Sequence, residues 1–131
     1  MQNLRESMIK CLDTCALIEI AMQNPRFNTY LNADIVIPNT TLAEFYGWIL
    51  QKYDERTALF WIKKCEPYVT PVKTAILISA MNFRSVHRKK KASNISFFDA
   101  VGYAFALEYK YAFVTSDNAF RNLPSVELVG K

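Results

Sequence analysis

Short apolar segments alternate with longer segments of helical periodicity along the whole chain, and this alternation restricts the fold more than any other feature. Residues 8–12, 35–37, 68–70, 111–115 and 126–129 are predicted to form strands. Helices are predicted at residues 15–23, 41–53, 55–64, 72–91, 96–109 and 118–123. Strands that alternate with helices pair in parallel. The sequence therefore predicts an α/β fold with a central parallel β-sheet covered by helices on both faces.

Local signals indicate where some of these elements begin and end. Pro38 stops the second strand, and Thr40 or Thr41 is predicted to cap the helix that follows. Residues 24–32 form a turn-rich connection. The chain contains no internal repeat and no linker composition, and its 131 residues suffice to bury a core. We therefore expect one domain that spans residues 1–131.

Composition argues against several classes of function. Only three Gly are present and none belongs to a glycine-rich phosphate loop, which disfavours nucleotide binding. The three Cys have no C-x-x-C spacing and His87 is the single histidine, so neither a disulfide framework nor a zinc site is expected. No apolar run approaches the ~18 residues of a membrane span or forms a signal sequence. We therefore expect a cytoplasmic protein that is neither secreted nor inserted in a membrane.

Two acidic residues closely follow predicted strands. Asp13 comes directly after the first strand, and Asp117 lies just beyond the fourth. In open parallel sheets, the functional crevice lies beyond the carboxyl ends of the strands, where the strand order reverses. The placement of these two acids therefore indicates a functional site at that edge of the sheet.

Three of the acids also have an ordinary structural explanation. Asp13 and Asp117 both precede helices, where an Asp side chain serves as an N-cap. Asp99 lies in a helix that is apolar nearly all round, so its carboxylate must find hydrogen bonds, a counter-charge or a metal. A capping arrangement with Ser96 is the alternative for Asp99. Capping and catalysis are compatible, because the first turn of a helix can face a cleft.

Glu44 has the weakest signal from periodicity. The apolar side chains of its helix lie on the opposite face: Leu42, Phe45, Tyr46, Ile49, Leu50 and Tyr53. This pattern favours an ordinary solvated Glu44. Gly47, nearly one turn later, would leave open space beside Glu44, which suits a cleft as well.

Taken together, the order and context of these acids resemble the PIN-domain family, including toxin nucleases of the VapC type. The similarity lies in three segments: KCLDTCALIEI, PNTTLAEFYGWIL and ISFFDAVGYAFALEYKYAFVTSDNAF. The last is the most specific, because an Asp opens an apolar helix and an apolar strand then leads to T-x-D and an aromatic residue. The resemblance spans nearly the whole chain. It implies a three-layer α/β/α sandwich and a Mg²⁺- or Mn²⁺-dependent ribonuclease that cuts RNA endonucleolytically.

The resemblance also assigns residues by position. It implies a catalytic, metal-binding cluster of four acids: Asp13, Glu44, Asp99 and Asp117. Thr14 and Thr115 match positions whose hydroxyl groups support that cluster. Many relatives have a further acid two residues after the Asp that matches Asp117, where this chain has Ala119. That departure would weaken the binding of a second metal ion or alter its geometry, and it leaves the four principal acids in place.

Phosphodiester hydrolysis explains the need for several acids. Negative charge develops on the attacking and leaving oxygens, and divalent cations stabilise that charge and orient the attack. Mg²⁺ prefers oxygen ligands, so carboxylates suit it better than thiols or imidazoles. We expect Asp13 and Asp99 to be the principal ligands. Asp117 is expected to bind directly or through water, and Glu44 to bind the metal or to position the attacking water.

The net charge of +4 suits a polyanionic partner. Five of the sixteen Lys and Arg residues lie in the segment RSVHRKKK: Arg84, Arg88, Lys89, Lys90 and Lys91. These five residues, called the basic segment below, are candidates for RNA phosphate contacts. A solvated helix terminus, where cations interact well with the helix dipole, is the alternative.

Protein partners are a separate question. The resemblance to VapC-type toxins adds a cognate antitoxin as a candidate partner. Trp48, Phe60 and Trp61 are candidates for a homodimer contact, although core packing is the simpler explanation for these aromatic residues.

Two other functional classes remain open. A PIN-like module without catalysis would bind RNA or act as a scaffold, and retention of all four acids argues against it. Aspartyl phosphotransferases and receiver domains also place an Asp after a parallel strand. The former require a second Asp where this chain has Cys15, and the latter require neighbouring acids before the phosphorylated Asp. Neither arrangement is found in this sequence.

Overall fold

Five parallel strands form the central sheet of the computed structural model, which describes residues 8–90 and 94–130. Their bounds are β1 Lys10–Leu12, β2 Ile35–Pro38, β3 Val69–Thr70, β4 Ala112–Thr115 and β5 Val126–Leu128. The order across the sheet is β3-β2-β1-β4-β5, and every neighbouring pair is parallel. The predicted parallel sheet is therefore confirmed.

Successive residues along the strands supply two separate cores. Cys11 aligns with Val36 and Phe113 in the neighbouring strands, and all three belong to one core cluster. The next residue, Leu12, aligns with Val114, and both belong to the second cluster. Side chains alternate between the two faces of a strand, so both faces of this sheet are apolar and buried, as parallel sheets require.

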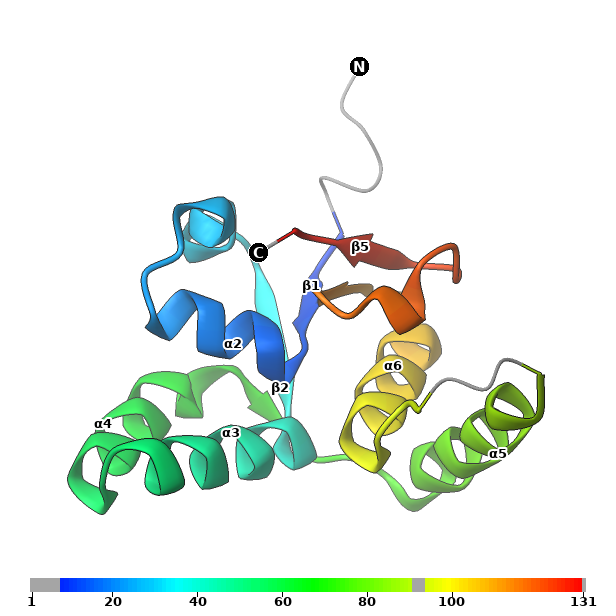
Figure 1. The fold of residues 1–131 in the computed structure, drawn as a ribbon, viewed down its shortest axis with the longest axis horizontal. Coiled ribbons are helices and arrows are strands. Elements are labelled where there is room, and N and C mark those ends of the chain that lie inside the picture. Colours follow the sequence, from blue (N-terminus) through cyan, green and yellow to red (C-terminus); the bar gives the residue numbers. More distant parts are fainter. Residues whose placement is uncertain (1–7, 91–93, 131) are drawn as a thin grey trace.

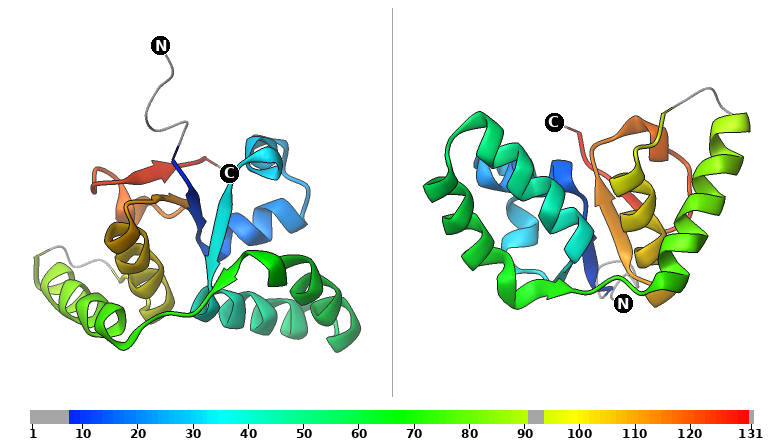
Figure 2. Two further views of the ribbon diagram at one scale, coloured as in Figure 1. Left: turned by 180° about the vertical axis from the view of Figure 1, so that it is seen from behind. Right: turned by 90° about the horizontal axis from the view of Figure 1, so that it is seen from below.

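Helices cover both faces and complete a three-layer α/β/α sandwich (Figure 1; Figure 2). The helices on one face are α2 Thr14–Ala21, the 3-10 helix η1 Pro25–Asn32, α3 Asn39–Lys52 and α4 Glu55–Cys65. Those on the other face are α5 Thr74–Lys90 and α6 Phe97–Tyr109. Two short 3-10 helices, η2 Glu66–Tyr68 and η3 Asn118–Phe120, precede β3 and follow β4. None of the helices in the described ranges has both the length and the apolar character that a membrane span requires.

Helix α6 packs closely against its neighbours because it contains Gly102. A Cβ atom added to this glycine would lie 3.1 Å from a ring carbon of Phe113 in β4 and 3.6 Å from Thr41 Oγ1 in α3. The absence of a side chain at Gly102 therefore lets the early turns of α6 approach both the sheet and the start of α3. This packing brings the first turn of α6, which contains Asp99, to the carboxyl edge of the sheet.

The strand order reverses beside β1. From β1 the chain proceeds through β2 to β3 at one edge, and it then returns to place β4 and β5 on the other side of β1. Such a reversal creates the crevice in which open α/β sheets bind ligands. Asp13 follows β1 and Asp117 follows β4, so both acids lie at this switch point.

Two local predictions are wrong. Neither Thr40 nor Thr41 caps α3, because β2 continues through Pro38 and the helix begins immediately at Asn39, without a side-chain cap. Thr41 is buried inside the helix instead. The turn-rich connection before β2 is largely helical, because the side chain of Asn24 accepts a hydrogen bond at the start of η1 and caps it.

Candidate active site

Asp13 lies at the corner between β1 and α2 and is only 2% exposed. It is the N-cap of α2, and its Oδ1 accepts a hydrogen bond from the backbone N–H of Thr14 at 2.8 Å. Its Oδ2 accepts from the hydroxyl of Thr115 at 2.8 Å and from the thiol of Cys15 at 3.3 Å. Asp13 therefore caps a helix and also points one carboxylate oxygen toward the end of β4.

Thr115, the last residue of β4, lies between two of the predicted acids. Its buried hydroxyl donates to Asp13 Oδ2 and accepts from the backbone N–H of Asp117 at 3.1 Å. Asp117 caps η3 through its Oδ1, which accepts from the N–H of Ala119 at 2.9 Å. One hydroxyl group thus connects the chain segments that follow β1 and β4.

Glu44 reaches the same region from α3. Its Oε1 accepts from the hydroxyl of Thr14, and its side chain is half-buried. Burial raises the pKa of Glu44, the Thr14 hydrogen bond opposes that rise, and the charge of Asp13 adds to it. The interpretation of Glu44 as a solvated residue is therefore wrong, because α2 packs against α3 and brings the Thr14 hydroxyl to the Glu44 carboxylate. The space beside Gly47, one turn later, is open as expected.

Asp99 lies in the first turn of α6, where its backbone N–H donates to Oγ of the N-cap residue Ser96 at 3.1 Å. The pKa of Asp99 is raised to about 8, first by burial and then by the charge of Asp13, with which it also shares a hydrogen bond. The charges of Glu44 and Asp117 raise this pKa further. The structure thus brings the four predicted acids into one electrostatically coupled cluster.

A cavity of about 410 Å³, called the acidic cavity below, lies where three of these acids meet. The residues that line it are Asp13, Cys15, Asp99, Ser116, Asp117 and Asn118. Glu44 is outside this lining and joins the cluster through Thr14. Three lining residues were not predicted: Cys15, Ser116 and Asn118. Each lies within two residues of a predicted acid, and that adjacency is the signal in the sequence that could have identified them.

Two polar groups in the acidic cavity differ from ordinary surface groups. The hydroxyl of Ser116 is buried and has no hydrogen-bond partner among the described residues. Burial, and then the charge of Asp13, raises the pKa of the Cys15 thiol to about 11, so the thiol remains protonated near neutral pH. The cavity therefore contains an unsatisfied hydroxyl and a thiol donor beside its carboxylates.

The sequence matches the PIN domain family model over residues 10–126, a range that includes all four acids and both threonines. The chain belongs to the PIN-domain family. This membership confirms the resemblance drawn from the three sequence segments. No curated protein sequence matches the chain significantly.

Solved structures share this PIN fold at low sequence identity. DNA-bound VapBC from Salmonella typhimurium matches with a TM-score of 0.74 and 16% identity, over 92% of this chain and 96% of that chain. VapC20 from Mycobacterium tuberculosis, a sarcin–ricin loop cleaving toxin, matches with a TM-score of 0.70 and 15% identity, over 92% and 98%. A toxin–antitoxin complex from Klebsiella pneumoniae matches with 0.70 and 16%, over 90% and 95%. These similarities confirm the predicted α/β/α sandwich.

PIN-domain nucleases generally use divalent metal ions, and the donors of the acidic cavity suit such an ion. Carboxylate oxygens are the preferred ligands of Mg²⁺ and Mn²⁺. Within the described residues, no three or more His, Cys, Asp or Glu side chains form a group that could hold a metal ion by themselves. Mg²⁺ is usually held by one or two carboxylates and retains several waters. The acidic cavity and its unpartnered Ser116 hydroxyl fit that partly hydrated mode of binding.

Four residues of the basic segment, Arg84, Arg88, Lys89 and Lys90, lie in the C-terminal part of α5. Arg88 and Lys89 are exposed to solvent, whereas Arg84 is half-buried and donates from Nε to the carbonyl of Ile95 at 2.7 Å. The side chain of Lys90 and the whole of Lys91 lie outside the described residues. Because α5 is followed in sequence by α6, this segment comes shortly before the helix that carries Asp99.

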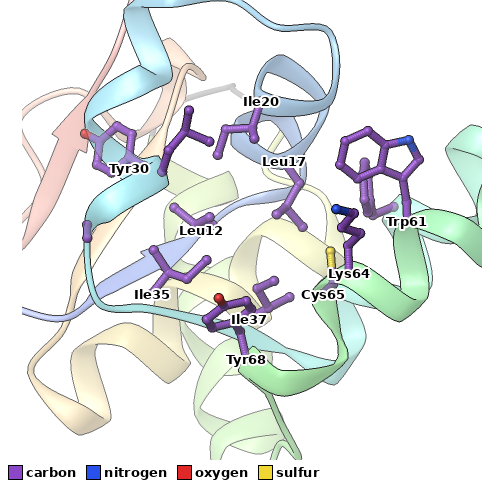
Figure 3. A pocket seen from close by; sticks show the side chains of 13 residues that line it. Leu12, Leu17, Ile20, Tyr30, Ile35, Ile37, Trp61, Lys64, Cys65 and Tyr68 are labelled. Atoms are coloured by element: carbon purple, nitrogen blue, oxygen red, sulfur yellow. The ribbon is translucent and has the colours of Figure 1, made fainter.

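A second cavity of about 230 Å³, called the apolar cavity below, lies on the sheet face covered by α2, η1 and α4 (Figure 3). Strand residues such as Leu12 and Ile37 line it together with Trp61, and Lys64 is the one charged residue among the described residues of its lining. Trp48 and Trp61 pack against the adjacent core, whereas Phe60 is 53% exposed. Core packing thus explains two of the three aromatic residues considered for a dimer contact.

Proposed function

We propose that this chain is a divalent-metal-dependent endoribonuclease that acts as the toxin of a toxin–antitoxin pair, and that residues 1–131 form a single PIN-like nuclease domain. The observation that carries the proposal is the convergence of four acids at the carboxyl edge of the sheet: Asp13, Glu44, Asp99 and Asp117. Membership of the PIN family supports nuclease chemistry. The similarity of the fold to toxin–antitoxin structures supports the toxin role.

Asp13 and Asp99 are the principal metal ligands in this proposal, because their carboxyl groups share a hydrogen bond. Asp117 binds on the β4 side, directly or through water. The metal is Mg²⁺ or Mn²⁺, and when bound it stabilises negative charge on the phosphodiester and lowers the pKa of a bound water.

The remaining residues orient these groups. The Thr14 N–H and the Thr115 hydroxyl hold the two oxygens of Asp13 in place, which fixes the rotamer of a principal ligand. Glu44 binds the metal or positions the attacking water, and the hydroxyl of Thr14 holds its carboxylate. Fixing ligands in this way is what the surroundings of a metal site contribute to its affinity.

Charge and the comparisons support the proposed partners. RNA is the proposed substrate, and the exposed side chains of Arg88 and Lys89 are the proposed phosphate contacts. The solved structures with a similar fold include VapBC complexes, so a cognate antitoxin is the proposed protein partner. A homodimer is also proposed, with the exposed ring of Phe60 as a candidate contact.

The test is RNA cleavage by the purified chain with Mg²⁺ or Mn²⁺, with and without EDTA. Wild type should cleave RNA and lose this activity in EDTA, while Asp13→Asn and Asp99→Asn should be folded and inactive. Glu108→Gln is the matched control, because Glu108 is an exposed acid on the same helix as Asp99 and should be dispensable. Full activity in either Asn variant overturns the assignment. RNA binding without cleavage under any metal favours the alternative of a non-catalytic PIN-like module.

A further inference from the structure

Cys15 contacts both the segment after β1, which contains Asp13, and the segment after β4, which leads to Asp117. Its Sγ lies 3.3 Å from Asp13 Oδ2 and 3.4 Å from Thr115 Oγ1, and it accepts from the backbone N–H of Ser116 at 3.2 Å. Cys15 belongs to the first turn of α2, whereas Thr115 and Ser116 lie at the end of β4 and lead to Asp117. One side chain therefore bridges the segment that holds Asp13 and the segment that holds Asp117.

The chemistry of the partners determines the direction of these hydrogen bonds. A carboxylate only accepts, so the thiol donates to Asp13 Oδ2, and the sulfur accepts from the N–H of Ser116. The hydroxyl of Thr115 donates its own proton to the same carboxylate oxygen. A thiol is a weak donor, but its removal would take away both a donor to Asp13 and the acceptor for a backbone N–H. The sulfur atom would also no longer fill the space between α2 and the loop after β4.

We propose that Cys15 is a positioning residue of the acidic cluster, where it sets the separation of the Asp13 and Asp117 carboxylates and thereby the affinity of the cluster for a divalent cation. This inference rests on the proposed function, because it concerns the ion that the nuclease requires. Within the described part of the chain, no hydrogen bond joins either of the other two cysteines to these acids. Cys11 is buried on the opposite face of the sheet, where its Sγ lies 3.8 Å from the carbonyl of Gly102, and Cys65 is buried at the end of α4.

The experiment measures binding of Mn²⁺ to the full chain without RNA, by electron paramagnetic resonance of the free ion. Cys15→Ala should raise the Kd for Mn²⁺ roughly tenfold, the lower end of the range for residues that hold metal ligands in place. Cys15→Ser keeps a donor and an acceptor at the same position and should recover most of the affinity. Cys65→Ala is the matched control, because it removes a thiol that lies outside the acidic cavity and should leave the Kd unchanged.

RNA cleavage supplies a second measurement on the same variants. The Mn²⁺ concentration for half-maximal cleavage by Cys15→Ala should rise with its Kd, while kcat at saturating Mn²⁺ stays near that of wild type. If Cys15→Ala does not fold, Cys15→Val supplies the same test, because it fills the space of the sulfur without a donor or acceptor.

Two results would overturn the role of Cys15 while the nuclease assignment stands. One is a folded Cys15→Ala or Cys15→Val variant with the Mn²⁺ affinity of wild type. The other is an equal loss of affinity in Cys15→Ser, because hydrogen bonding is the stated cause. If the wild-type chain neither binds Mn²⁺ nor cleaves RNA, that result overturns the proposed function and this inference together.

Discussion

Two consecutive residues, Leu12 and Asp13, line two cavities of opposite character. Leu12 lies in β1 and lines the apolar cavity, whereas Asp13 follows the end of the strand and lines the acidic cavity. The apolar cavity is surrounded by aliphatic and aromatic side chains that pack against the sheet (Figure 3). The acidic cavity is lined by three carboxylates. Backbone N–H groups at helix termini donate to those of Asp13 and Asp117, and the Thr115 hydroxyl also donates to Asp13.

The difference shows a division of roles in this fold: the residues around the apolar cavity supply stability, and those around the acidic cavity supply the chemistry. Burial of apolar side chains around the first cavity stabilises the folded chain. Around the second cavity, carboxylates of like charge converge in a partly buried place, which raises the pKa of Asp99 to about 8 and opposes folding when the acids are ionised. The sandwich therefore stabilises an acidic cluster that would not assemble by itself. Five predictions test this division, in order of decreasing effect.

Asp13→Asn should have the largest effect, on activity. A catalytic metal contributes several kcal/mol of transition-state stabilisation, and loss of about 4 kcal/mol corresponds to roughly a thousandfold in rate. We expect kcat/KM for RNA cleavage to fall by about that factor, measured with Mn²⁺ at fixed pH. Asp34→Asn changes an exposed acid immediately before β2 and should retain wild-type activity. Comparable losses in both variants would show that the acidic cavity is not the site of catalysis.

Ile37→Ala should affect stability and not chemistry. Ile37 lines the apolar cavity and is 1% exposed, so its truncation should lower the free energy of unfolding by about 3 kcal/mol. Leu31→Ala changes a residue of the same lining that is 62% exposed, and it should cost within about 0.5 kcal/mol. Urea unfolding measures both values. RNA cleavage per folded molecule should be unchanged in both variants, and a strong loss of activity in Ile37→Ala would contradict the division.

The metal-free protein should become less stable as pH rises. Asp99 binds its proton more tightly in the folded state, because its pKa is about 8 there and 3.8 without these interactions. Its contribution to stability is therefore fully present below pH 3.8 and is lost progressively as pH rises to about 8. Thermal unfolding in EDTA across this range measures the effect. Asp99→Asn should flatten the decline, whereas Glu108→Gln on the same helix should retain it.

Mn²⁺ should reverse this decline, because it binds the ionised cluster of the folded chain. At a hundred times its Kd, the ion should stabilise wild type by roughly 2.7 kcal/mol, and by more at pH 8 than at pH 5. Equal Mn²⁺ stabilisation of wild type and Asp99→Asn would remove Asp99 from the metal site and leave only its place in the capped first turn of α6.

Neutralising Arg88 and Lys89 should have the smallest effect, confined to RNA affinity. Fewer counterions would be released on binding, so the slope of log K against log salt should decrease in magnitude by about 1.4 for two lost contacts with single-stranded RNA. Cleavage at saturating RNA should be nearly unchanged. The matched control is the pair Lys63 and Lys64, which lie in the last turn of α4, where Lys64 lines the apolar cavity. The same change of slope in both pairs would mean that general charge, and not the basic segment, attracts RNA.

The candidate site was predictable to different degrees from one acid to the next. Asp13 and Asp117 could be placed from chain order alone, because parallel strands bring their carboxyl ends to one edge of a sheet. The burial of Asp99 followed from the apolar sequence of its helix. Glu44 could not be placed in this way, because helical periodicity describes one helix and does not include the neighbour that packs on its polar side. Only the family resemblance identified it.

By itself, the sequence determined the alternation of strands and helices, the two apolar faces of the sheet and the position of acids after β1 and β4. These properties depend on local periodicity and chain direction, which any segment carries without its neighbours. Only the tertiary structure decided that Cys15 bridges the segments that contain Asp13 and Asp117, and that the pKa of Asp99 rises. Both depend on distances between segments far apart in the chain, such as Asp13 and Thr115, which are 102 residues apart and joined by one hydrogen bond. Electrostatic coupling and hydrogen bonding depend on such distances in space, and packing of the whole sandwich sets them.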